Sequence, residues 1–139
     1  MTLLNSDYKP KDLTELNRIP SLSLAYLGDA VYEILVRDYI VSVMGLGSHN
    51  LHKSALSFVS APAQAEAVKK LTPHLTEEEK TVYKRGRNTK VNSVPKNATI
   101  EQYHAATGLE TLFGYLYLKG DGDRIHTLFT IIIGEENAI

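Results

Sequence analysis

The fold is decided by the stretch Leu22-Ser-Leu-Ala-Tyr-Leu-Gly-Asp-Ala-Val-Tyr-Glu-Ile-Leu-Val-Arg37. Its large hydrophobic residues recur at the three- and four-residue spacing of one helix face. Alanine, valine and tyrosine make most of the remaining surface apolar as well, and a helix that is apolar nearly all round is surrounded by protein. We therefore predict a central helix that opens at Pro20-Ser21 and ends near the glycines at Met44-Gly-Leu-Gly47.

Two residues in the middle of this helix are unfavourable there on local grounds. Asp29 is expected to be a buried charge in such a helix, which is unfavourable unless a cation, hydrogen-bond donors or a metal pairs with it. Gly28 costs about 1 kcal/mol in a helix interior relative to alanine, but it allows another backbone or a ligand to approach closely. An alternative is that Asp29, Glu33 and Arg37 form a polar stripe in which Glu33 pairs with Arg37. The spacing leaves both interpretations open.

Length and composition indicate one domain over residues 1–139, with residues 1–19 as an amino-terminal arm. The chain has 139 residues, a net charge of −1 and no cysteine, which excludes disulfides and thiolate metal sites. We expect a cytoplasmic protein without a membrane partner. The first residues do not form a signal peptide, and the apolar run near the carboxyl end is too short to span a bilayer.

The rest of the chain also indicates helices, so the predicted fold class is all-α. Turn residues and capping patterns separate the segments, including capping boxes at Thr76–Glu79 and Thr99–Gln102. We predict helices at 12–16, from Ser48 or His49 to 60, at 63–71, at 76–88, at 99–119, and from Asp121 or Asp123 to about 134.

Glu110, in the second long helix, is a further carboxylate among apolar neighbours. If the two long helices pack together, Asp29 and Glu110 face each other. Two carboxylates from facing helices, together with waters, make a site for Mg²⁺, which prefers oxygen ligands and keeps much of its hydration shell. The alternative is that Glu110 lies on the solvent side of its helix. The five histidines show no convincing zinc pattern.

The segment from 80 to 96 contains six basic residues and no acidic one. A concentrated basic segment in a nearly neutral protein suggests a site for a polyanion, and interleaved amides and hydroxyls can reach phosphate or 2′-hydroxyl oxygens. Gly86 is expected to let the backbone approach a phosphate closely. The alternative is a solvated loop. The predicted RNA-binding residues are Lys84, Arg85, Arg87, Asn88, Lys90 and Lys96.

Four segments resemble the ribonuclease III family. Its signature helix is similar to Leu24-Ala-Tyr-Leu-Gly-Asp-Ala-Val-Tyr-Glu33, and its second catalytic segment is similar to Ala106-Thr-Gly-Leu-Glu-Thr-Leu-Phe-Gly-Tyr-Leu-Tyr-Leu118. Two further segments are similar to the short subfamily called mini-ribonuclease III, and these are Lys84-Arg-Gly-Arg-Asn-Thr-Lys90 and Val94-Pro-Lys-Asn97. The matches occur in the family's order from about residue 20 to residue 118.

The resemblance implies an all-α ribonuclease III endonuclease domain that acts as a homodimer on double-stranded RNA with Mg²⁺. It implies no separate double-stranded-RNA-binding domain, and products with a 5′-phosphate and a 3′-hydroxyl. It also implies a role in maturing the ends of the large-subunit (23S) ribosomal RNA precursor, with a large-subunit ribosomal protein as a candidate partner. Asp29 matches the signature aspartate, and Glu110 matches the glutamate of the second segment.

Three acidic positions of ordinary ribonuclease III are not acidic here. Ala25 and Thr107 occupy two of them, and the third is replaced near Asn50. We therefore expect one Mg²⁺ per site, held by Asp29 and Glu110, with Asn50 or Thr107 holding its waters. The missing acids also leave open a non-catalytic RNA-binding module with the ribonuclease III fold.

Overall fold

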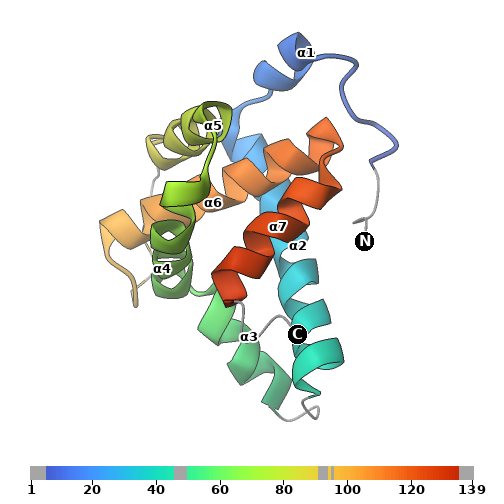
Figure 1. The fold of residues 1–139 in the computed structure, drawn as a ribbon. Helices are drawn as coiled ribbons and strands as arrows, with labels where there is room; N and C mark the ends of the chain where they lie inside the picture. Colours follow the sequence, from blue (N-terminus) through green and yellow to red (C-terminus); the bar gives the residue numbers. More distant parts are fainter. Residues whose placement is uncertain (1–5, 46–49, 91–93, 95, 135–139) are drawn as a thin grey trace.

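The computed structural model describes residues 6–45, 50–90, 94 and 96–134. Within these ranges every regular element is a helix, which confirms the all-α prediction. Helix α6 (Ile100–Lys119) runs through the middle of the molecule, and α2 (Ser21–Tyr39) crosses it (Figure 1). The other elements are α1 (Leu13–Asn17), the π-helix η1 (Ile40–Met44), α3 (Leu51–Val59), α4 (Ala61–Leu71), the 3₁₀ helix η3 (Thr72–His74), α5 (Glu77–Arg87) and α7 (Gly122–Ile133).

Side-chain caps set the helix starts largely as predicted. Both capping boxes are present, the first in α5 and the second in α6, and Asp121 caps α7. The predicted start of α4 at Ala63 was wrong, because Pro62 lies in its first turn, where proline is tolerated, and Ser60 caps it. The described part of α3 starts at Leu51, and the predicted start at 48 or 49 lies outside the described residues.

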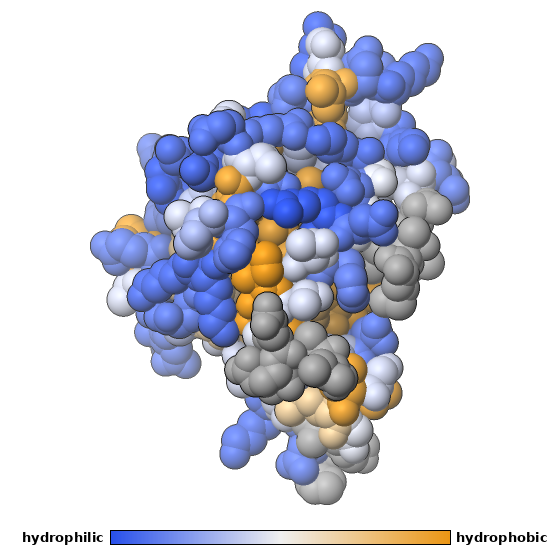
Figure 2. Space-filling model, in the orientation of Figure 1, coloured by the Kyte–Doolittle hydropathy of each residue, from blue (hydrophilic) through white to orange (hydrophobic). Residues whose placement is uncertain are grey.

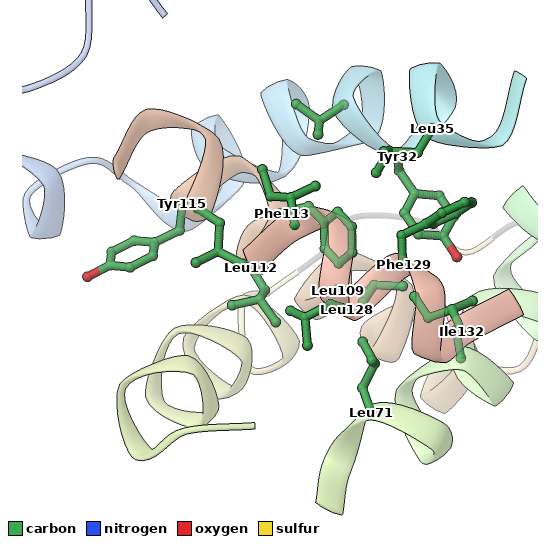
Figure 3. Packing of buried hydrophobic residues seen from close by; sticks show 14 of the residues in the cluster. Tyr32, Leu35, Leu71, Leu109, Leu112, Phe113, Tyr115, Leu128, Phe129 and Ile132 are labelled. Carbon is green, nitrogen blue, oxygen red and sulfur yellow. The ribbon is translucent and has the colours of Figure 1, made fainter. Parts of the chain in front are cut away.

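Most of the core is formed by side chains from α2, α4, α6 and α7 that point toward one another (Figure 3). Tyr32 of α2 packs edge-on against Phe113 of α6, with ring centroids 5.4 Å apart, and against Phe129 of α7 at 5.9 Å. All three residues are almost completely buried. This aromatic group therefore joins α2, α6 and α7.

Helices α2 and α6 touch backbone to backbone where they cross. A Cβ atom added at Gly28 would overlap the carbonyl oxygen of Glu110, and one added at Gly114 would overlap the carbonyl oxygen of Leu24. The expectation that Gly28 admits another backbone is thus confirmed, and Gly114 is its counterpart on the facing helix.

One face of α2 is exposed, so the prediction that protein surrounds the whole helix was wrong for this chain by itself. The exposed fractions are 49% for Leu22, 86% for Tyr26 and 46% for Ile34, and the same face continues into η1, where Val41 is 59% exposed. The other described helices pack against the opposite side. On the face that Figure 2 shows, hydrophilic residues predominate around a hydrophobic band. No helix in the described ranges is both long and apolar enough to span a membrane.

Helix α5 is held against α6 and α7 rather than projecting as a free basic arm. Gly86 is buried, and a Cβ atom there would overlap the side chain of Thr111 in α6. The expectation that Gly86 faces a phosphate was therefore wrong, because its lack of a side chain lets α6 approach instead. Glu79 of α5 accepts two hydrogen bonds of 2.8 Å from the guanidinium of Arg124 in α7.

We predict that Gly28→Ala lowers the free energy of unfolding by about 3 kcal/mol, because the added methyl forces the two backbones apart. The sign of this change is informative, because at an unconstrained helix position alanine is more stable than glycine by about 1 kcal/mol and the substitution would stabilise the protein. Urea unfolding measures the effect, and Ala30→Gly, at an exposed position of the same helix, is the control. A Gly28→Ala protein as stable as the wild type would contradict the close contact.

Candidate active site

The crossing of α2 and α6 brings the carboxyl groups of Asp29 and Glu110 together. Gly28, next to Asp29, lies against the carbonyl of Glu110. The charge of Asp29 is near enough to act on the ionisation of Glu110. Glu110 is partly buried, whereas Asp29 is exposed. The expectation that Asp29 is a buried charge was therefore wrong, and Glu110 is the carboxylate that the protein desolvates.

Burial and neighbouring charges shift the ionisation of Glu110. The pKa of Glu110 is raised from 4.5 to about 7, and burial is the largest cause. The negative charge of Asp29 is the second cause, and hydrogen bonding of the protonated Glu110 to Asp29 adds to the rise. Glu33 adds a smaller repulsion, and an amide hydrogen bond from Gln64 opposes the rise. Such a pair of mutually repelling carboxylates attracts a cation, which would relieve the repulsion.

Two polar residues beside the acid pair were missed as site residues. Gln64 of α4 donates a hydrogen bond of 3.3 Å to the Oε2 atom of Glu110. Glu33 lies one turn after Asp29 and pairs with the exposed Arg37 at 3.1 Å, as the polar-stripe alternative expected. The signal for Gln64 was weak, being only a single amide in an alanine-rich helix; the signal for Glu33 was its four-residue spacing from Asp29.

The residues at the three substituted acidic positions differ in their surroundings. Ala25 and Thr107 are buried, and the hydroxyl of Thr107 donates to the carbonyl of Tyr103 at 3.0 Å. Asn50 is exposed just before α3. The roles of Thr107 and Asn50 in holding metal waters stay predictions.

The donors present fit a hydrated divalent cation. Over the described residues no cluster of three or more histidine, cysteine or acidic side chains could hold a metal. Asp29 and Glu110 nevertheless supply carboxylate oxygens at one place, and Glu110 is charged only at a cost that a cation would offset. Mg²⁺ is commonly bound through one or two carboxylates while water fills the remaining positions.

The predicted RNA-binding residues fall into two groups. Lys84, Lys90 and Lys96 are exposed. The guanidinium of Arg85, by contrast, donates to the carbonyl of Ile19 at 3.1 Å, which ties α5 to the chain entering α2.

Arg87 also makes contacts within the protein. Its guanidinium lies over the ring of Tyr83 at 5.7 Å and donates to the Oδ1 atom of Asn88 at 3.2 Å. The exposed lysines are therefore the least committed cations of this segment. Residues 91–93 and 95 of the predicted loop lie outside the described residues.

Comparisons with known proteins show the family and the fold of the chain. Residues 22–121 match the model of the ribonuclease III domain. The chain is 44% identical to a mini-ribonuclease 3 of Clostridium tetani over 94% of this chain and 85% of that protein. It is also 44% identical to the mini-ribonuclease 3 of Enterococcus faecalis, over 91% and 98% of the two chains. A crystal structure of a Fusobacterium nucleatum protein is similar to this structure, with a TM-score of 0.79 and 32% sequence identity. The match covers 88% of this chain and 98% of that chain.

We predict that Asp29→Asn lowers the pKa of Glu110 from about 7, because one repelling charge is lost, while burial keeps it above 4.5. A pKa raised by folding stabilises the metal-free protein below pH 4.5, and this contribution is lost as the pH rises through about 7. Because the pKa of Glu110 is raised less in Asp29→Asn, the variant should lose less of its free energy of unfolding over this pH range. Carboxyl carbon chemical shifts measure the pKa, with Glu101→Gln, at an exposed position of α6, as the control. An unchanged pKa of Glu110 would show that Asp29 does not act on it, and would contradict the carboxyl pair.

Proposed function

The chain belongs to the ribonuclease III family, in its mini-ribonuclease III branch, and on this basis we propose that it cleaves double-stranded RNA with Mg²⁺ held by Asp29 and Glu110. It is an endoribonuclease of the ribonuclease III type, a family that acts on double-stranded RNA. The observation that carries the proposal is the carboxyl pair at the crossing of α2 and α6.

The two carboxylates have different parts in this proposal. Asp29 is exposed and therefore open to a hydrated ion and to the phosphate backbone, whereas Glu110 is partly buried and anchored by Gln64. Bound Mg²⁺ supplies stabilisation of the charge that builds on the phosphate and lowers the pKa of a coordinated water. The protein contributes the orientation of both carboxylates, which the close helix contact restricts.

The exposed lysines of the basic segment are proposed to bind the duplex backbone. Double-stranded RNA is recognised mostly by its shape, its phosphates and its 2′-hydroxyls, so cations that follow the backbone need little sequence selectivity. Lys84 lies in the last turn of α5 and Lys90 in the segment that follows the helix, and both residues are exposed in the isolated chain. Arg85 and Arg87 support this surface through their contacts within the protein.

We also propose a homodimer formed through the exposed face of α2. Tyr26 and Ile34 of α2, with Val41 of the adjoining η1, leave an apolar stripe uncovered in the single chain, and such stripes mark interaction surfaces. An isologous contact would cover the same stripe on both subunits. Asp29 lies beside this stripe, so the two sites would flank the interface. Sedimentation at the assay concentration measures the assembly, and a fully active monomer would contradict it.

The proposed substrate is the paired ends of the large-subunit (23S) ribosomal RNA precursor, which the resemblance to mini-ribonuclease III suggests. A cytoplasmic location and a large-subunit ribosomal protein partner are further predictions of the same resemblance. Since duplex RNA offers side chains little sequence information in its deep groove, selection of one site is expected to depend on duplex shape and on such a partner.

We predict that Asp29→Asn and Glu110→Gln each reduce cleavage on the order of 1,000-fold. Each variant loses several kcal/mol of the transition-state stabilisation that the metal supplies. The rate falls tenfold for each loss of about 1.4 kcal/mol. Duplex affinity should change little, because the basic segment remains. The measurement is the cleavage rate with Mg²⁺ and with chelator on a duplex from the precursor ends and on an unrelated duplex of equal length.

Asp38→Asn is the matched control, since Asp38 is an exposed acid on the same helix, where it accepts a hydrogen bond from Ser42. Normal turnover by either site variant would remove that acid from the mechanism. Wild-type protein that binds the duplex without any metal-dependent cleavage would favour the alternative of a non-catalytic RNA-binding module.

We predict that Lys84→Ala and Lys90→Ala together reduce the salt slope of duplex binding by about two units, one for each phosphate that the variant no longer neutralises. These exposed residues are preferable to Arg85, whose removal would also break its hydrogen bond to Ile19. Duplex affinity measured against salt concentration tests the prediction. Alanine at Lys9 and Lys11, exposed lysines before α1, is the control, and an unchanged slope in the test variant would make this segment a solvated surface.

A further inference from the structure

Gln64 of α4 lies where three helices meet at the carboxyl pair. Its side chain is 2% exposed. The amide nitrogen donates to the carbonyl of Val59, at the end of α3, at 2.9 Å, and to Oε2 of Glu110 in α6 at 3.3 Å. The second contact joins residues 46 positions apart in sequence. Gln64 thus connects the beginning of α4 to Glu110, the partly buried member of the carboxyl pair.

The orientation of this amide follows from its partners. A carbonyl and a carboxylate both accept hydrogen bonds, so the nitrogen of Gln64 must face them. The oxygen atom, Oε1, is buried and has no partner among the residues that the structure describes. Burying an amide with an unsatisfied oxygen is unfavourable, and packing alone would favour an apolar side chain. The neighbouring Ala63, Ala65 and Ala67 are apolar in the same helix.

We propose that Gln64 is a positioning residue that holds the Glu110 carboxylate toward Asp29 for the divalent cation. This inference rests on the proposed function. Without the amide, repulsion by Asp29 and the tendency of a charged group to reach water would both turn the Glu110 side chain away. The amide opposes this by donating to one carboxylate oxygen, which leaves the other oxygen to the cation. Residues that orient metal ligands in this way commonly affect metal affinity as strongly as they affect activity.

The competing interpretation is that Gln64 only links the helices. Its hydrogen bond to Val59 closes the junction of α3 and α4, and a purely structural role would end there. Such a role predicts a change in unfolding free energy without a change in cation affinity. Metal titration of the folded protein in the absence of RNA therefore separates the two interpretations.

The first experiment is calorimetric titration of Mg²⁺ into wild type and Gln64→Met, which keeps the length of the side chain and removes the amide. We expect metal affinity to fall about tenfold and turnover to fall similarly, with duplex affinity in chelator unchanged. Thr111→Val is the matched control, because Thr111 is a fully buried residue next to Glu110 whose hydroxyl group donates to the carbonyls of Thr107 and Ser21 instead. Its metal affinity should equal that of wild type.

A second measurement needs no variant of Gln64. The chain contains two glutamines, Gln64 and Gln102, so selective nitrogen-15 labelling gives two side-chain amide signals. Mg²⁺ should shift the Gln64 signal and leave Gln102 unchanged, since Gln102 belongs to the capping box of α6. Asp29→Asn should abolish the shift, and Gln102→Glu assigns the two signals.

The possible outcomes separate this inference from the proposed function. Wild-type protein that binds no Mg²⁺, or binds it equally after Asp29→Asn, would overturn the proposed metal site. Metal binding that depends on Asp29 but neither shifts the Gln64 amide signal nor weakens in Gln64→Met would overturn the positioning role alone. A weakened affinity in Gln64→Met, with wild-type affinity in Thr111→Val, supports it.

Discussion

The rest of the structure depends on the contact between the backbones of α2 and α6. Packed helices have axes about 8–10 Å apart, depending on the side chains at the contact, and glycine there allows the closest approach. Gly28 and Gly114 provide that approach from both sides. The contact sets the crossing around which the aromatic core packs, with Tyr32 fitting against Phe113 and Phe129. It also sets the separation of the two acids, which side chains of ordinary size would increase.

Much of the fold could be predicted from local sequence, because helix ends depend on nearby chemistry. Threonine with a glutamate or glutamine three residues later marks the starts of α5 and α6, and the structure shows both capping boxes. The pairing of Asp29 with Glu110 also followed from sequence, through the packing of two long apolar helices and the family resemblance. The family matches confirm that resemblance.

What could not be predicted depends on contacts between distant parts of the chain. The exposure of Asp29 depends on which face of α2 is left uncovered, and periodicity cannot show this when nearly every position is apolar. Gly86 has no local sign that α6 will approach it, and Arg85 none that it will bind the carbonyl of Ile19. Gln64 reaches Glu110 across 46 positions, so no spacing rule relates them.

Glu110 takes part in two contacts of different kinds. Its side chain belongs to the acid pair, while its peptide carbonyl is the surface against which Gly28 rests. The acid pair is consequently not a portable motif. A designer who grafted the two carboxylates onto another pair of helices would transfer the functional groups without their spacing. The transferable unit is the whole crossing, in which two glycines without any functional group determine how close the acids lie.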